Sequence, residues 1–302
     1  MIKKTAIIGM GALGILYGTH MIDQDGIQNV CYVMDAKRSE KYKNQTFYKN
    51  GTAYQMPVCD CERAEAADLV IVAVKYNGLA SAVDTMKRCV GEHTIIMSVM
   101  NGISSEEIIA DQYGKEHMIY TVAQGMDAMK FGNELTYTRM GELRIGAKEE
   151  CQQKNLQAVK EYFDRIQMPY TEDVDIMHRI WGKFMLNVGV NQCCMAYETD
   201  YHGCLVPGEA NRTMIAAMRE VIVLARCEGV NIGEKDLNEY VDLLNTLSPE
   251  GMPSMRQDGL AHRPSEVEMF SGTILRLAKK HGILVPSNRY LYERVKELEA
   301  AY

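Results

Sequence analysis

Three polar residues recur every four positions in a segment that is otherwise strongly apolar. They are Lys183, Asn187 and Asn191, and the apolar residues Ile180 and Phe184 share the same spacing. In a helix with about 100° per residue, Lys183 lies about 60° from Ile180, so the polar set crosses the apolar face. Burial without partners costs on the order of 1–3 kcal/mol for each amide and more for the ammonium. We therefore expect a ligand that hydrogen-bonds to them. The alternative is a lysine that reaches solvent and asparagines paired with neighbouring backbone.

A glycine-rich turn near the start of the chain offers a second kind of chemistry. An apolar run at residues 4–8 leads into the pattern G-x-G-x-x-G, which is followed by a helical stretch to about residue 23. In this strand-turn-helix context the glycines permit a tight turn and a close approach of a pyrophosphate to the helix N-terminus. The pattern predicts a dinucleotide-binding loop, and the alternative is a glycine-rich turn of another βα unit. The loop residues are Gly9, Gly11, Ala12, Leu13 and Gly14.

An acidic residue follows the next apolar run at the distance expected for a ribose contact. The run Val30–Met34 ends in Asp35, about twenty residues beyond the glycines. A carboxylate there can accept hydrogen bonds from a ribose 2′-hydroxyl, which favours NAD(H). Lys37 and Arg38 come directly afterwards and could instead pair with the 2′-phosphate of NADP(H). Charge alone leaves the cofactor open, and a further alternative is that Asp35 only begins the next turn.

The elements that must position these residues are strands that alternate with helices. Residues 68–74 and 94–99 are rich in β-branched residues, and residues 79–89 between them are predicted to be helical. This alternation predicts a parallel, doubly wound sheet. Lys75 and Asn101 follow the two runs, at the sheet edge where ligands bind in such folds, so both are candidates for contacts with the cofactor. The alternatives are a solvated lysine and an Asn-Gly turn.

The second half of the chain has a different pattern of apolar and polar residues. Residues 135–139 and 143–145 suggest a hairpin that closes the first domain, and after about residue 174 the pattern becomes helical. We predict an α/β protein with a Rossmann-like, doubly wound domain at residues 1–170 and an all-helical domain for substrate binding and catalysis at residues 171–302. The predicted helices cover residues 174–195, 208–229, 234–246, 265–281 and 286–300.

Composition restricts the class of protein. The 302 residues are 47% apolar and 24% charged, with a net charge of −7 and no long basic run, so we expect a compact protein that does not bind nucleic acid. Nine cysteines without a CxxC pattern indicate reduced thiols and no metal site. The apolar stretch at residues 5–22 could be a signal or a membrane anchor, but its four glycines argue against both. We expect a cytoplasmic, soluble protein without a membrane partner.

Taken together, the motifs resemble the ketopantoate reductase (2-dehydropantoate 2-reductase) family along nearly the whole chain. No single motif is as specific as their order. The residues that carry the resemblance are the N-terminal GMGALG, Lys75, Asn101-Gly102, Trp181-Gly182-Lys183, Asn187, Asn191, Ser254-Met255, Gln257-Asp258, Glu266, Gly272, His281-Gly282-Ile283 and Val285-Pro286.

The resemblance implies a function for the polar helix face. It implies an oxidoreductase of pantothenate biosynthesis that reduces ketopantoate, a small 2-oxo acid, to pantoate with NADP(H). A homodimer is possible because a helical second domain often supplies a dimer surface. Lys183 would be the general acid that protonates the C2 carbonyl oxygen, and partial burial would lower its pKa toward the working range. Glu266 would lie near the substrate hydroxyl and the nicotinamide ribose; read alone it could be a helix-start acid, and Glu268 competes with it. Three residues would orient the substrate: Asn187, Asn191 and Ser254.

Four positions depart from the family pattern. Asp35 stands where many relatives carry an arginine, and Gln192 follows Asn191 where they have proline. Gly251 and Ser271 replace two asparagines. Cofactor and substrate therefore stay open, with NAD(H) possible because of Asp35. The alternatives are a reductase of another bulky 2-oxo acid and a non-catalytic protein that senses a nicotinamide dinucleotide.

Overall fold

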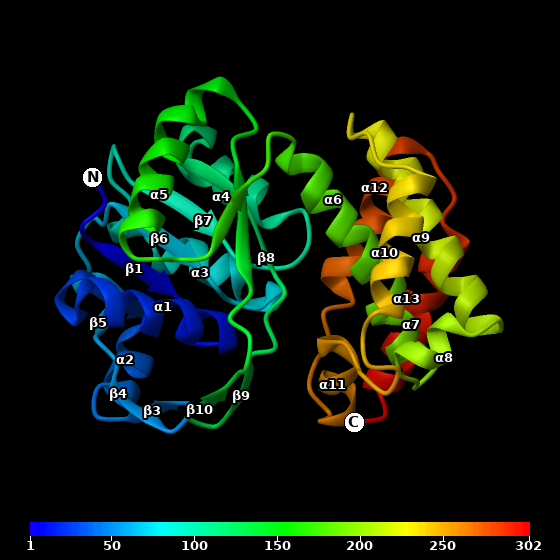
Figure 1. Ribbon diagram of the computed structural model, residues 1–302, viewed down its shortest axis with the longest axis horizontal. Helices are drawn as coiled ribbons and strands as arrows, with labels where there is room; N and C mark the ends of the chain where they lie inside the picture. Colours follow the sequence, from blue (N-terminus) through cyan, green and yellow to red (C-terminus); the bar gives the residue numbers. More distant parts are fainter. The chain divides into compact units, whose positions relative to one another are not determined.

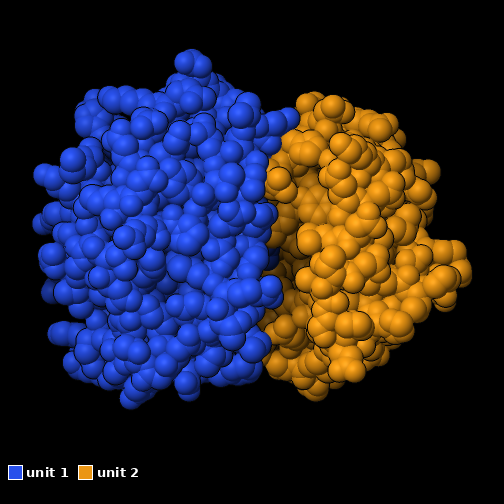
Figure 2. Space-filling model, viewed as in Figure 1, with its two compact units in different colours: residues 1–101, 105–176 blue, residues 102–104, 177–302 orange.

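The chain forms two compact units. The computed structural model describes residues 1–302 (Figure 1). The first unit comprises Met1–Asn101 and Ser105–Ile176, and the second comprises Gly102–Ser104 and Met177–Tyr302; Figure 2 distinguishes them by colour. None of the helices combines the length and the apolar character that crossing a membrane requires.

The first unit is built on an eight-stranded sheet with the order β12-β11-β8-β7-β6-β1-β2-β5. The six strands from β8 to β5 in this order run parallel, whereas β11 pairs antiparallel with β8. The doubly wound parallel sheet predicted from the sequence is therefore confirmed. The strands are β1 (Thr5–Ile8), β2 (Val30–Met34), β5 (Val58–Asp60), β6 (Leu69–Val72), β7 (Ile95–Ser98), β8 (Met118–Gln124), β11 (Glu142–Gly146) and β12 (Tyr170–Glu172).

Helices cover both faces of this sheet (Figure 1). The strand order runs in opposite directions from β1 to β2 and from β6 to β8, so right-handed crossovers place their helices on opposite faces. On one of these faces, Ile15 of α1 and Val159 of α5 are fully buried in the same core cluster as Ile7 and Ile71 of the sheet. The helices are α1 (Ala12–Asp25), α2 (Ala36–Tyr42), α3 (Leu79–Thr85), α4 (Ser105–Tyr113) and α5 (Gln153–Arg165).

A second, small sheet corrects one prediction. Its order is β4-β3-β10-β9, with β3 at Thr46–Lys49, β4 at Thr52–Gln55, β9 at Met129–Phe131 and β10 at Glu134–Thr136. The predicted hairpin of residues 135–139 with 143–145 is wrong, because β10 pairs with β9 and β3 whereas β11 pairs with β8 and β12. Gly141 (φ +68°) turns the chain from one sheet to the other rather than within a hairpin.

The second unit is helical, as predicted, and its long helices agree with the predicted ranges within a few residues. Two segments, Asn187–Asn191 and Glu268–Gly272, are π-helical; we name them the first and the second π turn. The short helices α8 and α11 had not been predicted. The helices are α6 (Ile176–Leu186), α7 (Gln192–Ala196), α8 (Tyr201–Leu205), α9 (Glu209–Cys227), α10 (Glu234–Asn245), α11 (Ser254–Leu260), α12 (Thr273–His281) and α13 (Pro286–Glu299).

The division between the units differs slightly from the predicted domain boundary. Residues 171–176 were predicted to belong to the second domain, whereas they lie in the first unit. The reason is β12, which pairs with β11 through Leu143↔Tyr170 and Ile145↔Glu172 and so extends the sheet beyond residue 170.

Candidate functional site

The glycine turn between β1 and α1 is packed so tightly that two of its glycines are required by the fold. Gly9 has φ +114°, and a Cβ on it would lie 2.5 Å from the Ala73 carbonyl oxygen. A Cβ on Gly14 would lie 2.2 Å from the Gly9 oxygen. These distances are below any real Cβ contact, so a side chain at either position would force the backbone to move. The two glycines hold α1 close to the end of β1.

Gly11 differs from its two neighbours in the motif. A Cβ there would meet only the Ala73 oxygen, at 3.7 Å, which is an ordinary contact, and the residue is exposed. Gly11 is also the N-cap of α1, and no side chain caps this helix. The missing side chain therefore leaves room over the first-turn N–H groups of the helix, where an anion binds favourably. The residues fit the pyrophosphate of a dinucleotide, with Ala12 and Leu13 supplying backbone N–H groups.

The other predicted cofactor residues lie along the same edge of the sheet. Gly9, Asp35, Lys75 and Asn101 each follow one of four adjacent parallel strands, β1, β2, β6 and β7. Lys75 is exposed, and Asn101 is half-buried beside Gly102, which has φ +93°. The fold thus brings these residues to the carboxyl edge, as parallel topology requires.

Asp35 has a structural task at this edge. Its Oδ1 accepts a hydrogen bond from the Arg38 backbone N–H at 2.9 Å and so caps α2. Asp35, Lys37 and Arg38 are all exposed. The structure therefore places one carboxylate and two cations at the end of β2, and the cap satisfies only part of the carboxylate.

In the second unit, Lys183 lies half-buried on α6. Burial lowers the pKa of its ammonium to about 8, because a charge is poorly solvated there, and the nearby carboxylate of Glu266 opposes this shift. The helical unit thus brings together two residues that are 83 positions apart in the sequence. A lysine with a pKa near neutrality can both give and take a proton under ordinary conditions.

Glu268, the competing acid, is engaged elsewhere. The Tyr292 hydroxyl donates to its Oε1 at 2.7 Å, and Lys296 Nζ lies 4.0 Å from the same oxygen. Both partners belong to α13. Glu266 is therefore the acid whose charge acts on Lys183.

The two asparagines lie on the first π turn, and both are largely buried. Asn187 is 8% exposed and Asn191 is 6% exposed. Both amides are thus largely removed from solvent on the helical segment that carries Lys183. Ser254 differs from them, since it lies exposed at the first position of α11 and no hydrogen bond joins it to Lys183 or Glu266.

The comparisons with known proteins agree with this arrangement. The family described as "Ketopantoate reductase PanE/ApbA" matches residues 5–150, and "Ketopantoate reductase PanE/ApbA C terminal" matches residues 175–299. Together these two matches cover nearly all of the chain. The chain belongs to the ketopantoate reductase family. It is an NAD(P)H-dependent reductase of the 2-oxo acid type, and a nicotinamide dinucleotide is its cofactor.

Individual relatives of this reductase are distant in sequence but similar over their full length. It is 20% identical to a 2-dehydropantoate 2-reductase of Vibrio cholerae, over 98% of each chain. A structure of D-mandelate dehydrogenase with NADH and anilino(oxo)acetate matches with a TM-score of 0.86 and 20% identity, over 99% of each chain. A dimeric ketopantoate reductase from Staphylococcus aureus matches with a TM-score of 0.80 and 21% identity, over 99% of each chain.

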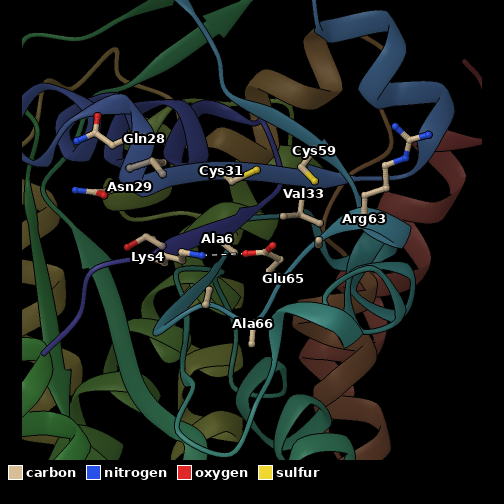
Figure 3. A pocket seen from close by; sticks show the side chains of 14 residues that line it. Lys4, Ala6, Gln28, Asn29, Cys31, Val33, Cys59, Arg63, Glu65 and Ala66 are labelled. Atoms are coloured by element: carbon tan, nitrogen blue, oxygen red, sulfur yellow. Dashed lines mark hydrogen bonds and ion pairs between the residues drawn. The ribbon is translucent and has the colours of Figure 1, made fainter.

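A cavity of about 240 Å³ in the first unit of the reductase contains none of the predicted site residues. It lies against β1, β2 and β5, where Lys4 and Glu65 form an ion pair of 2.9 Å (Figure 3). The thiols of Cys31 and Cys59 border it, and burial raises the pKa of Cys31 to about 12, so this thiol stays protonated. No group of three or more His, Cys, Asp or Glu side chains is placed to hold a metal ion.

One set of buried polar residues in the helical unit of the reductase was not predicted from the sequence. Gln192, Ser271 and Asn288 are polar and fully buried, at 0% exposure. The sequence identified Gln192 and Ser271 only as departures from the family pattern. No periodicity connects positions so far apart, so nothing in the sequence shows that they meet.

Proposed function

We propose that this reductase converts ketopantoate to pantoate, with Lys183 as the general acid. The observation that carries the proposal is the half-buried Lys183, whose pKa is lowered to about 8 beside the carboxylate of Glu266. A cation with this pKa is largely protonated at neutral pH, yet it loses its proton far more readily than a surface lysine. These are the properties that protonation of a ketone oxygen demands.

Two residues of the helical unit have different roles in the proposed proton transfer. When bound, the reduced nicotinamide supplies the hydride that the C2 carbon receives. The Lys183 ammonium hydrogen-bonds to the C2 carbonyl oxygen and transfers a proton to it as the oxygen gains charge, so the ketone becomes an alcohol and the amine becomes neutral. The amine then regains a proton from solvent. Glu266 favours the charged form of Lys183 and so keeps the acid loaded between turnovers.

The two buried asparagines suit the rest of a 2-oxo acid. Asn187 and Asn191 lie four residues apart on the first π turn, on the same helical segment as Lys183. Each amide offers two donors and one acceptor, which match a carboxylate and a hydroxyl group of a small acid. Because buried amides need hydrogen-bond partners, a bound substrate could supply them here.

A second substrate class is supported by a particular departure from the family pattern. A Cβ on Gly251 would lie 3.0 Å from the ring of Tyr201 and 2.9 Å from the Ser248 oxygen, so the asparagine of relatives does not fit here unchanged. The loop that leads to Ser254 is thus built differently. The similarity to D-mandelate dehydrogenase makes an aryl 2-oxo acid the second candidate substrate.

The test is a matrix of substrates and cofactors followed by nicotinamide absorbance. Ketopantoate, benzoylformate and pyruvate are each combined with NADH and NADPH, because Asp35 favours the former cofactor and Lys37 and Arg38 the latter. We expect the highest kcat/KM with ketopantoate. A preference for benzoylformate would support the second candidate, and cofactor binding without turnover of any 2-oxo acid would refute reduction and support a sensing function.

We also propose a homodimer, on the basis of the dimeric relative from Staphylococcus aureus. Light scattering behind a sizing column distinguishes a monomer of 34.1 kDa from a dimer of twice that mass. A monomer at micromolar concentration would contradict this part of the proposal.

A further inference from the structure

The second π turn contains a break in its backbone hydrogen bonds that one side chain repairs. Phe270 N–H donates to the Glu266 carbonyl at 3.1 Å, four residues back, whereas Gly272 N–H donates to Val267 at 2.9 Å, five residues back. The change of register skips the N–H of Ser271. This donor instead bonds to Oε1 of Gln192 at 3.1 Å, across 79 residues of sequence. A buried N–H without a partner would be costly, so Gln192 stabilises the register of this turn.

The same side chain is bonded to the first π turn. Gln192 directly follows Asn191, and its Nε2 donates to the Val188 carbonyl at 2.8 Å. One carboxamide therefore accepts from one π turn and donates to the other, and both of its polar atoms are used. Since Gln192 is 0% exposed, water does not compete for these bonds.

The bonded groups are anchored to the rest of the helical unit. The Ser271 hydroxyl donates to Asn288 Oδ1 at 3.0 Å. Asn288 Nδ2 in turn donates to Glu220 Oε2 at 2.8 Å and to the Ala217 carbonyl at 3.2 Å. Helices α9 and α13 thus hold Ser271 of the second π turn through hydrogen bonds that do not involve Gln192.

We propose that Gln192 is a positioning residue that sets the distance between Glu266 and Lys183. The inference rests on the proposed function, since it assigns Gln192 to the same reaction. Glu266 supplies the carbonyl that begins the second π turn. Lys183 lies on α6, which continues directly into the first π turn, so the segments that hold these two residues are the ones that Gln192 joins. Without the carboxamide, the skipped N–H of Ser271 loses its partner and the turn that holds Glu266 is free to change register.

The variant that tests this is Gln192→Met, which keeps length and volume but removes both hydrogen bonds. Its matched control is Gln152→Met in the first unit. Gln152 is also 0% exposed, accepts from the N–H groups of Lys148 and Glu149 at 2.7 and 3.0 Å, and donates to Lys115 at 2.8 Å. Both variants lose a fully bonded buried amide, but only one lies beside the π turns.

We expect Gln192→Met to lower kcat/KM for the 2-oxo acid by about 10- to 100-fold, the loss typical of misplaced reacting groups. The basic limb of its pH profile should move to lower pH, as Glu266 ceases to support the charge on Lys183. Affinity for the dinucleotide should stay within about twofold. Gln152→Met should lose thermal stability without these changes. If Gln192→Met lost stability but kept the wild-type pH profile and kcat/KM, the positioning role would be refuted.

A second measurement separates this inference from the proposed function. The pH dependence of reductive methylation of Lys183, followed by mass spectrometry, reports the pKa of its amine without turnover. A lower pKa in Gln192→Met than in the wild type supports the inference even if no 2-oxo acid is reduced, and an equal pKa overturns it. If Gln192→Met does not fold, Gln192→Asn keeps a neutral amide but is one methylene shorter, so it cannot reach both Ser271 and Val188, and the same downward shift, smaller in size, is expected.

Discussion

The glycine turn and the two π turns both depart from regular backbone, but they do so for different reasons. At the glycine turn the cause is local: Gly9 and Gly14 are needed because a Cβ would meet backbone at 2.5 and 2.2 Å. The second π turn has no such cause within itself, since its skipped N–H is satisfied by Gln192 of another helix. A backbone cradle for an anion can therefore be contained in one short motif, whereas a side-chain site depends on distant partners.

The two regions also offer different chemical groups. The glycine turn presents backbone N–H groups at the start of α1, which bind an anion but transfer no proton. The helical unit presents an amine, a carboxylate and two amides, of which Lys183 has a pKa of about 8. Substitutions in the first region should therefore affect cofactor affinity, and those in the second should affect the chemical step.

The largest separation of these effects is expected for Lys183→Ala. Loss of a general acid should lower kcat by about 10²- to 10⁴-fold, while the Kd of the dinucleotide, measured by nicotinamide fluorescence, stays unchanged. Lys235→Ala is the control, because this side chain is 89% exposed on α10. Wild-type kcat in Lys183→Ala would contradict the assignment of the chemical step to the helical unit.

The glycine turn should show the reverse pattern. In Gly11→Ala the new Cβ meets only the Ala73 oxygen at 3.7 Å, so the protein should fold normally. The added methyl group occupies the space over the helix N-terminus, and we expect the Kd of the dinucleotide to rise about tenfold or more. Gly14→Ala is the comparison, since its Cβ would lie 2.2 Å from backbone and should lower the Tm as well. Calorimetry and fluorescence titration measure the two effects. An unchanged Kd in Gly11→Ala would exclude a close approach of the pyrophosphate to Gly11.

The sequence predicted the elements whose signals are local. The strand at Val30–Met34 has the predicted bounds, and the helix predicted at 208–229 is Glu209–Cys227. The hairpin was wrong because strand pairing is a long-range choice, and Leu135 pairs in a different sheet from Leu143. The alternation of apolar residues indicates strands but not their partners.

For the site, the residue types were predictable and their relations were not. The spacing of Lys183, Asn187 and Asn191 indicated a polar helix face, and the structure shows both amides buried. Family resemblance implied a role for Glu266 toward the substrate, but its effect on Lys183 was not predicted, because the two residues are 83 positions apart. The bond between Gln192 and Ser271 was not foreseen, although both had been recognised as departures. When two positions of one protein both depart from the family pattern, a contact between them is worth testing.

Glu266→Gln should change the pH dependence of the reaction. The charge of Glu266 raises the pKa of Lys183 against the effect of burial, so its removal should lower that pKa below about 8. Because protonation of the ketone needs the charged amine, kcat/KM for reduction falls as pH rises through this pKa, and the descending limb should move to lower pH. Oxidation of the alcohol needs the neutral amine, so its rate should rise with pH over the same range. Glu268→Gln, two residues away and bonded to Tyr292, should leave the limb in place. If the descending limb moved equally in both variants, the pKa of Lys183 would depend on the total negative charge nearby and not on Glu266 in particular.

The smallest effects are expected at Asp35, where structure and cofactor recognition compete for one side chain. Its Oδ1 caps α2 by accepting from the Arg38 N–H at 2.9 Å. Asp35→Ala removes both the cap and the carboxylate and should cost about 0.5–2 kcal/mol of stability, whereas Asp35→Ser retains a capping oxygen and should cost little. If the carboxylate also accepts from a ribose hydroxyl, both variants should lose NADH affinity and shift the ratio of kcat/KM values toward NADPH by a few-fold. A shift in Asp35→Ala alone would assign Asp35 to the helix cap only, because the serine differs from the alanine chiefly in preserving α2. Asp35 would then belong with Gly9 and Gly14, as a residue that the turn needs for its own structure rather than for its ligand.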